Sequence, residues 1–106
     1  MVDREIVEKV KTYLKELSEE GIQVSRAILF GSHVKGTARG DSDIDLLLIS
    51  PLFDNCSDEF APRIWLNASR TDYRIEPFAV GEKRFAEDDV SVILEVARQE
   101  GFEIVA

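Results

Sequence analysis

The sequence has very few of the side chains that bind zinc or form covalent cross-links. It contains one cysteine, Cys56, and one histidine, His33. A lone cysteine cannot form an internal disulfide, and zinc motifs need several cysteine or histidine ligands. Cys56 also stands in a polar stretch without a neighbouring histidine, which argues against a catalytic thiol. Any bound metal ion would therefore have oxygen ligands, which favours magnesium, manganese or calcium over zinc.

Long hydrophobic runs and an excess of positive charge are also missing. No apolar run exceeds five residues, far below the roughly 20 that a membrane-spanning helix needs. The first residues, MVDREIVEKVK, lack the apolar block of a signal peptide, so we expect a cytoplasmic protein. The 21 acidic residues outnumber the 13 basic ones, giving a net charge of -8. This charge opposes direct contact with nucleic acid or an anionic membrane unless cations intervene.

What is present is typical of a small folded domain. The chain has 106 residues, of which 44% are hydrophobic and 32% charged. This length and composition predict a single domain over residues 1–106 with one modest core. The sequence shows no internal repeat and no low-complexity tract.

Hydrophobic periodicity and the positions of glycine and proline predict helices and strands along the whole chain. The predicted elements are a helix over 2–20 that stops at Gly21, a strand over 22–30, a short helix or turn over 32–39, a strand over 42–50, a loop over 51–58, a short helix around 60–68, a strand over 72–80, a helix that begins at the acidic residues 87–89 and stops at Gly101, and a final strand over 102–106. Pro62 is expected in the early turn of its helix, and Pro77 at a sheet edge or bulge. Tyr73 and Ile75 are predicted to share the buried face of their strand.

Two aspartates stand directly before the hydrophobic run Leu46-Leu47-Leu48-Ile49. Residues two apart in a strand face the same way, so Asp43 and Asp45 should converge, with Cα atoms roughly 6.5 to 7 Å apart. Two such anions repel each other, and a divalent cation between them would remove the conflict. Taken alone, the S-D-I-D stretch is better explained as a polar turn, with Ser42 or Asp43 capping the backbone and Asp45 facing water, because short acidic motifs are frequent by chance.

A glycine-serine pair, Gly31-Ser32, precedes the aspartates at the expected end of a strand. Glycine lets a phosphate group approach the backbone, and serine begins a helical turn whose free N–H groups point outward. The polyphosphate of a nucleotide would fit between this turn and a metal ion at the aspartates. A glycine-serine pair by itself is also a common turn.

The spacing of these residues resembles a known signature. Gly31-Ser32, Gly36 and the run S42-D43-I44-D45-L46 resemble the G-S-(spacer)-[ST]-D-x-D-[LIV] motif of the DNA polymerase beta nucleotidyltransferase superfamily. The pattern FGSHVKGTARGDSDIDLLL and the later RIEPFAV are similar, more narrowly, to the minimal nucleotidyltransferase (MNT) domains, which are often encoded beside a HEPN-domain partner. The resemblance covers roughly residues 24 to 85.

The resemblance implies an α+β (mixed α/β) nucleotidyltransferase fold, with a mixed sheet of about four strands and helices packed on one side. It implies that Asp43 and Asp45 are magnesium ligands and that Gly31 and Ser32 bind the nucleotide. The third carboxylate of the family falls on Glu76, where superfamily members more often have aspartate. Two-ion magnesium chemistry would then activate a hydroxyl, with Glu76 holding the second ion or accepting the proton.

The same resemblance implies a magnesium-dependent transfer of AMP from ATP to a hydroxyl on a partner protein. That partner would be a HEPN-type ribonuclease toxin, which would make this chain a protein adenylyltransferase and the antitoxin of a pair. Direct binding to nucleic acid or to a membrane is not expected, and the oligomeric state stays open. One alternative is a non-catalytic module that neutralises a HEPN partner by contact alone. Another, less favoured because no substrate domain accompanies the motif, is a transferase acting on a small molecule such as an aminoglycoside.

Several other side chains have two interpretations. Lys35 and Arg39 could reach phosphate oxygens, although solvated surface charge is the more common role of such residues. Without the upstream motif, Glu76 could be an ordinary edge-strand carboxylate paired with Arg74 or Lys83. His33 is kept out of the predicted site. The single tryptophan and the phenylalanines are expected in the core or on a partner surface rather than stacked on a base.

Overall fold

The computed structural model describes residues 2–105, apart from the side chains of residues 56 and 57. The interpretation of Cys56 as an unreactive thiol therefore lies outside the described residues. In chain order the elements are α1 (Arg4–Glu19), β1 (Arg26–Phe30), α2 (Ser32–Lys35), β2 (Ile44–Ile49), α3 (Phe53–Thr71), β3 (Ile75–Val80), α4 (Glu82–Glu87), α5 (Val92–Glu100) and β4 (Phe102–Ile104). Within this part of the chain, no helix is both long enough and apolar enough to cross a membrane.

The four strands form one mixed sheet in the order β3-β2-β1-β4. β1 pairs antiparallel with both β2 and β4, whereas β2 and β3 run parallel. β2 is a central strand, and five of its six residues are buried, as expected for a strand covered on both faces. The predicted α+β nucleotidyltransferase fold with a four-stranded mixed sheet is confirmed.

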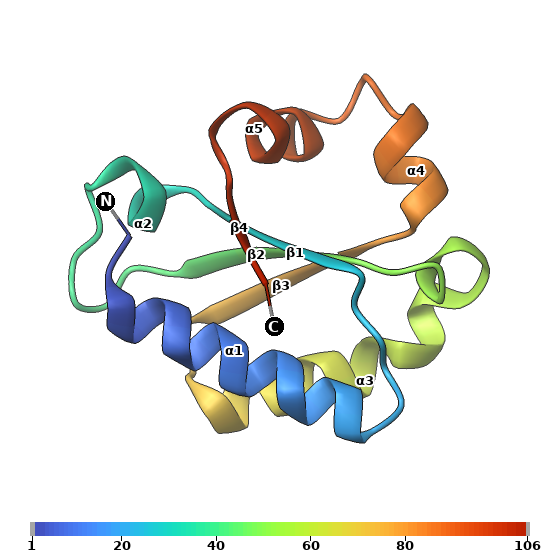
Figure 1. The fold of residues 1–106 in the computed structure, drawn as a ribbon, viewed down its shortest axis with the longest axis horizontal. Helices are drawn as coiled ribbons and strands as arrows, with labels where there is room; N and C mark the ends of the chain where they lie inside the picture. Colours follow the sequence, from blue (N-terminus) through green and yellow to red (C-terminus); the bar gives the residue numbers. More distant parts are fainter. Residues whose placement is uncertain (1, 106) are drawn as a thin grey trace.

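Two long helices, α1 and α3, cover one face of the sheet (Figure 1). α1 buries an apolar stripe that includes Val10, Tyr13 and Leu17, the spacing that places residues on one side of a helix. Asp3 caps its start by accepting a hydrogen bond from the Glu5 N–H at 2.8 Å. These helices and the sheet residues beneath them form the larger hydrophobic cluster of the protein.

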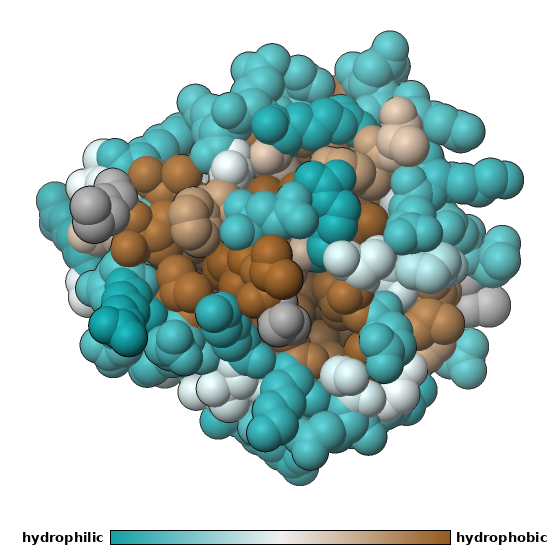
Figure 2. Space-filling view, viewed as in Figure 1, coloured by the Kyte–Doolittle hydropathy of each residue, from teal (hydrophilic) through white to brown (hydrophobic). Residues whose placement is uncertain are grey.

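The opposite face carries α4 and α5 (Figure 1), so helices cover both faces of the sheet and not, as was expected, one side alone. Leu94 and Ala97 of α5 pack with Leu47 and Ile49 of β2 and with other residues of the same face in a smaller cluster. Figure 2 shows hydrophobic residues gathered in the central band where the sheet lies, with hydrophilic residues over the helices on either side. Because alternate residues of a strand share a face, Asp45 lies in the same row as Leu47 and Ile49.

The end of α1 shows why one predicted strand boundary is wrong. The strand begins at Arg26 rather than at residue 22. Gly21, with φ of 84°, donates to Ser18 O at 3.0 Å, and Ile22 donates to Leu17 O at 2.9 Å. These two bonds form a Schellman motif. The β-branched Ile22 is therefore fully buried as part of the helix end, although its residue type suggested a strand.

The loop predicted over 51–58 is also wrong, because α3 already begins at Phe53. Pro62 consequently lies in the middle of a 19-residue helix rather than in an early turn. A proline removes one backbone hydrogen bond and crowds the preceding turn. The helix continues through it because buried residues on both sides, Phe53, Ile64 and Ala68, anchor it to the core; tertiary packing supplies most helix stability in proteins.

The region after β3 departs from expectation as well. Helix α4 was not predicted, and the acidic residues 87–89 do not begin the next helix, which starts at Val92. Asp54, in the first turn of α3, accepts a hydrogen bond from the Lys83 N–H at 3.1 Å and so caps α4. Asp88 accepts bonds from the N–H groups of Val90 and Ser91, both at 2.9 Å. The predicted stop at Gly101 is confirmed, and the final strand is present but ends at Ile104.

Strand β3 is an edge strand, as Pro77 predicted. Ile44 N donates to Arg74 O at 2.8 Å and Ser50 N to Val80 O at 3.2 Å, so the even-numbered residues of β3 are those that bond to β2. Pro77 belongs to the outward row, where its missing N–H breaks no bond within the sheet. Tyr73 precedes the strand and is 77% exposed, so its predicted burial is wrong.

Candidate functional site

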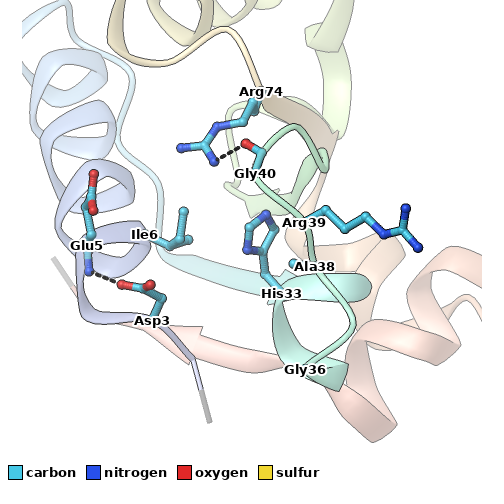
Figure 3. Close-up of a pocket in the computed structure, with 9 residues that line it drawn as sticks. All are labelled: Asp3, Glu5, Ile6, His33, Gly36, Ala38, Arg39, Gly40 and Arg74. Atoms are coloured by element: carbon cyan, nitrogen blue, oxygen red, sulfur yellow. Dashed lines mark hydrogen bonds between the residues drawn. The ribbon is translucent and has the colours of Figure 1, made fainter.

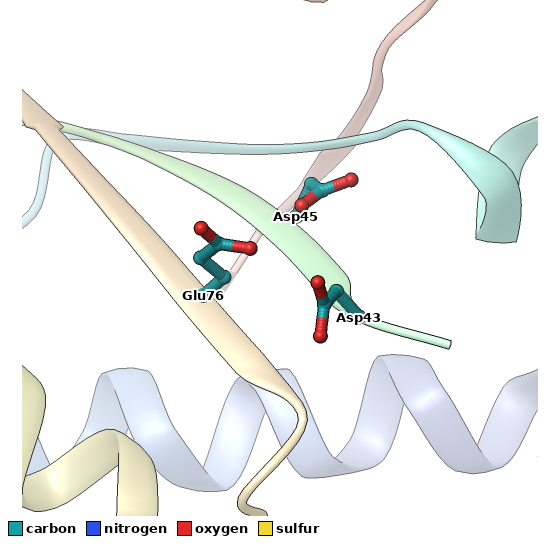
Figure 4. A group of neighbouring side chains, drawn as sticks. All are labelled: Asp43, Asp45 and Glu76. Carbon is teal, nitrogen blue, oxygen red and sulfur yellow. The ribbon is translucent and has the colours of Figure 1, made fainter. Parts of the chain in front are cut away.

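Three carboxylates converge at one end of the sheet. One oxygen from each of Asp43, Asp45 and Glu76 lies within 4.8 Å of the others, and Figure 4 shows the three side chains pointing toward one another from β2 and β3. Asp45 and Glu76 are paired residues of the parallel strands, whereas Asp43 lies just before β2. The two aspartates lie together as expected, and Glu76, the third carboxylate implied by the resemblance, belongs to the same group.

Gly31 connects the glycine-serine turn with this carboxylate group. It follows Phe30, which is paired with Asp45 across β1 and β2. Its φ is 84° with ψ of -150°, a combination that is essentially restricted to glycine. A Cβ atom at this position would collide with Oδ2 of Asp45. The turn therefore needs glycine for two reasons, its backbone conformation and the space occupied by the Asp45 carboxylate.

Ser32 begins the short helix α2, which ends at Gly36 in the left-handed conformation with φ of 81°. The carbonyl of Gly31 accepts hydrogen bonds from Val34 and Lys35, both at 3.1 Å. The N–H groups of the first residues of a helix have no acceptor within the helix. The turn thus presents backbone donors beside a carboxylate that could hold a cation, an arrangement suited to a phosphate group.

The electrostatics of the site favour a bound cation or a proton. Partial burial raises the pKa of Asp45, the charge of Asp43 raises it further, and His33 partly opposes this effect. Burial also raises the pKa of Glu76, as do the neighbouring charges of Asp43 and Asp45. Among the described residues, Glu76 takes part in none of the ion pairs, so the alternative pairing with Arg74 or Lys83 is not seen. Three oxygen donors with unresolved repulsion fit magnesium or manganese.

The backbone just before Asp43 is held by side chains that were not predicted as site residues. Arg74 Nη1 donates to Gly40 O at 3.0 Å, and Arg74 is itself bound by Asp72. His33, which is buried, has its Nε2 atom 3.3 Å from Ser42 O. The closely spaced aspartate and arginine in TDYRIE were a weak signal for such a pair, because many exposed pairs have the same spacing.

The two basic residues between the halves of the motif do not reach the carboxylates. Lys35 is exposed, and its Nζ atom lies 3.9 Å from Oε2 of Glu100. Arg39 borders a pocket of about 390 Å³ between the start of α1 and the loop after α2, which none of the three carboxylates lines. Its side chain extends away from the other lining residues (Figure 3). Both positions agree with solvated surface charge. The single tryptophan, Trp65, is 51% exposed and therefore not a core residue.

Comparison with known proteins agrees with the fold and the motif. Two solved structures have a similar fold: a candidate nucleotidyltransferase from Sulfolobus solfataricus and a toxin–antitoxin protein crystallised with AMP-PNP. The first has a TM-score of 0.60 and 17% identity over 93% of this chain and 78% of its own. The second has a TM-score of 0.58 and 20% identity over 94% of this chain and 73% of its own.

At the level of sequence, no curated protein matches significantly. Residues 7–102, however, match the profile of the nucleotidyltransferase domain family. This match spans the glycine-serine turn, both aspartates and Glu76. The chain therefore belongs to the nucleotidyltransferase domain family.

Proposed function

We propose that this protein is a magnesium-dependent nucleotidyltransferase that moves AMP from ATP to a hydroxyl group of a partner protein. The observation that carries the proposal is the convergence of Asp43, Asp45 and Glu76 within 4.8 Å. Burial and, second to it, neighbouring negative charge raise the pKa of Asp45 and of Glu76, and a bound cation would offset both effects. The family match gives the general class of reaction.

In the proposed site, Asp43 and Asp45 hold magnesium and Glu76 completes the oxygen ligands or accepts a proton. Bound magnesium would neutralise phosphate charge and lower the pKa of the acceptor hydroxyl. The acceptor oxygen forms a bond to the α-phosphorus of ATP, and the bond from that phosphorus to the α–β bridging oxygen breaks. Pyrophosphate leaves, and the hydroxyl proton goes to Glu76, which would act as the general base.

Gly31 and Ser32 would bind the phosphates of ATP through the backbone N–H groups at the start of α2. A Cβ atom added at Gly31 would collide with the carboxylate of Asp45, so a phosphate at this turn would also lie next to a metal ion held by the aspartates. Such positioning and charge neutralisation provide most of the rate in phosphoryl transfer. Few protein groups are needed, which suits a domain of this size.

The proposed acceptor is a hydroxyl, such as that of a tyrosine, on a HEPN-type toxin, with this chain acting as the antitoxin. Support comes from the MNT-like motif in the sequence and from the fold shared with a toxin–antitoxin protein. The net charge of -8 suits a partner with basic surface. The cytoplasm is the proposed location.

The decisive experiment mixes the protein and the product of the neighbouring gene with ATP labelled at the α-phosphate and with magnesium. We expect label on the neighbour, dependent on magnesium and absent with the Asp43→Asn, Asp45→Asn double variant. The matched control is Asp41→Asn, which removes an exposed carboxylate of the same loop that is not in the group. An unlabelled neighbour bound equally well by wild type and double variant would instead identify a non-catalytic antitoxin.

A further inference from the structure

We propose that Arg74, fixed by Asp72, is a positioning residue that holds the loop of residues 36–43 and thereby places the Asp43 carboxylate for metal binding. The proposal rests on the proposed function, because it assigns Asp43 to a metal site. Arg74 itself makes no contact with the carboxylate group in the described hydrogen bonds. The effect of its side chain would pass through the backbone at Gly40, three residues before Asp43.

The position of the Asp43 carboxylate depends on a loop, whereas the other two carboxylates are fixed by strands. Asp45 and Glu76 are half-buried within strands, whereas Asp43 is exposed and precedes the first residue of β2. Residues 36–43 form turns without regular structure. Within the loop, Ser42 N donates to Arg39 O at 3.1 Å and Arg39 N donates to Ser42 Oγ at 2.8 Å. These local bonds shape a turn but do not attach it to the rest of the protein.

Arg74 holds the chain on both sides of Asp43, the loop through its side chain and the start of β2 through its backbone carbonyl. Its Nη1 atom donates to Gly40 O at 3.0 Å, three residues before Asp43. Its backbone carbonyl accepts from Ile44 N at 2.8 Å, one residue after Asp43. Across residues 2–105, the side chains that bond this loop from outside are those of Arg74 and His33. Figure 3 shows the Arg74 guanidinium reaching the Gly40 carbonyl.

The guanidinium is in turn held rigidly by a buried carboxylate. Arg74 Nε donates to Asp72 Oδ1 at 3.0 Å and Nη2 to Asp72 Oδ2 at 2.8 Å. Lys9 of α1 also donates to Asp72 Oδ2, at 2.7 Å. The side chains of Asp72 and Arg74 are only 4% and 15% exposed. With two nitrogens occupied by the carboxylate fork, the third can point only along the guanidinium plane, toward the loop.

This arrangement requires arginine and not merely a positive charge. A planar guanidinium can bind a carboxylate with two nitrogens and a carbonyl with the third, whereas the ammonium of lysine lacks this fixed geometry. Partners that orient metal ligands usually change metal affinity by roughly 10- to 100-fold when removed. We therefore expect Arg74 to change the magnesium dependence of nucleotide binding and not only the stability of the protein.

The test uses the full chain in four forms: wild type, Arg74→Gln, Arg74→Lys and Arg70→Gln. Arg70 is an exposed arginine in the last turn of α3 and controls for the lost charge. The magnesium concentration that gives half-saturation is measured by calorimetry with α,β-methylene ATP, whose α–β bridge cannot be cleaved. We expect Arg74→Gln to need about tenfold more magnesium, Arg74→Lys to fall between, and Arg70→Gln to match wild type.

Amide hydrogen exchange on the ligand-free proteins provides the second readout. Exchange at residues 37–43 should accelerate in Arg74→Gln while the amides of β1 and β2 keep their wild-type protection, which also shows that the variant is folded. If wild type binds the analogue and Arg74→Gln shows an unchanged magnesium midpoint, the positioning role is overturned. If wild type does not bind the analogue, the proposed function fails. In that case hydrogen exchange alone tests whether Arg74 holds the loop. Faster exchange at residues 37–43 in Arg74→Gln supports this role, and exchange at the wild-type rate overturns it.

Discussion

Two acidic groups lie close to the start of β3. One is Asp72 with its basic partners, the paired group, and the other is the carboxylate cluster that contains Asp45 and Glu76, the unpaired group. Their pKa values shift in opposite directions. Asp72 is buried, and hydrogen bonds from Arg74 and Lys9 hold its pKa well below the usual range. Asp45 and Glu76 are less buried, yet their pKa values are raised, because burial is compounded by neighbouring negative charge. Burial alone therefore does not decide the state of a carboxylate. The paired group has its counter-ions within the fold, whereas the unpaired group forms no ion pair among the described residues.

The largest expected effect is on the unpaired group. Asp45→Asn should lower AMP transfer at least about a hundredfold, because loss of a metal ligand removes several kcal/mol of transition-state stabilisation. The measurement is the rate of label transfer at saturating ATP and magnesium. Asp41→Asn should retain wild-type activity. A fully active Asp45→Asn would remove this residue from the proposed site.

The next effect is on the paired group and concerns stability. Asp72→Asn should lower the free energy of unfolding by about 3 kcal/mol, because Arg74 and Lys9 lose their buried counter-ion. Since the folded pKa of Asp72 is lowered, its stabilisation is fully present above the unfolded value near 4 and is lost as the pH falls through the folded pKa. Urea unfolding at pH 7 and at lower pH measures both. A loss below about 1 kcal/mol would contradict the comparison.

A third prediction concerns the turn beside the unpaired group. Gly31→Ala should destabilise the protein by about 2 kcal/mol and weaken magnesium-dependent ATP binding, because the added Cβ collides with the Asp45 carboxylate. Gly21→Ala, at the end of α1 and away from the site, is the matched control: φ is also positive, at 84°, but nothing lies within 4 Å of an added Cβ. It should cost about 1 kcal/mol and leave magnesium affinity unchanged. Equal effects on magnesium affinity would contradict the prediction.

The smallest expected effect, a change in stability, tests most directly whether the carboxylates of the unpaired group repel one another. Without magnesium at pH 7, Asp45→Asn should be more stable than wild type by about 0.5 kcal/mol, the size expected from removing a like-charge cross-strand pair. Because the folded pKa values of Asp45 and Glu76 are raised, wild type gains stability as the pH falls through them, and the difference should vanish below a pH of about 4. Thermal melts over this pH range test the prediction. A destabilised Asp45→Asn would show that Asp45 is structurally paired.

The sequence predicted the parts of the fold and site that depend on local periodicity. Asp43 and Asp45 were expected on one face because alternate residues of an extended chain point the same way. Pro77 indicated the edge of the sheet because proline has no N–H group, and in an edge strand its nitrogen can face away from the neighbouring strand. Glu76 came from the family resemblance, and the parallel register of β2 with β3 places it beside Asp45.

The missed features depend on residues that are distant in the chain. Helix α4 is capped by Asp54, 29 residues earlier, and α3 passes through Pro62 because its buried residues anchor both halves. The role of Arg74 was missed because its partner carbonyl, Gly40, lies 34 residues away. Local propensity contains no information about such contacts, which appear only once the sheet order is known.

The row of β3 that contains Pro77 has a consequence for how this protein can associate. A strand from another molecule that paired with this edge of β3 would meet Pro77, whose ring nitrogen cannot donate a hydrogen bond. The other edge strand, β4, is only three residues long. Extending the sheet into a neighbouring molecule is therefore disfavoured at both rims. A partner protein is therefore expected to bind the helices and exposed side chains and not the strand edges. The sheet can then keep the carboxylates in fixed positions while a partner is bound.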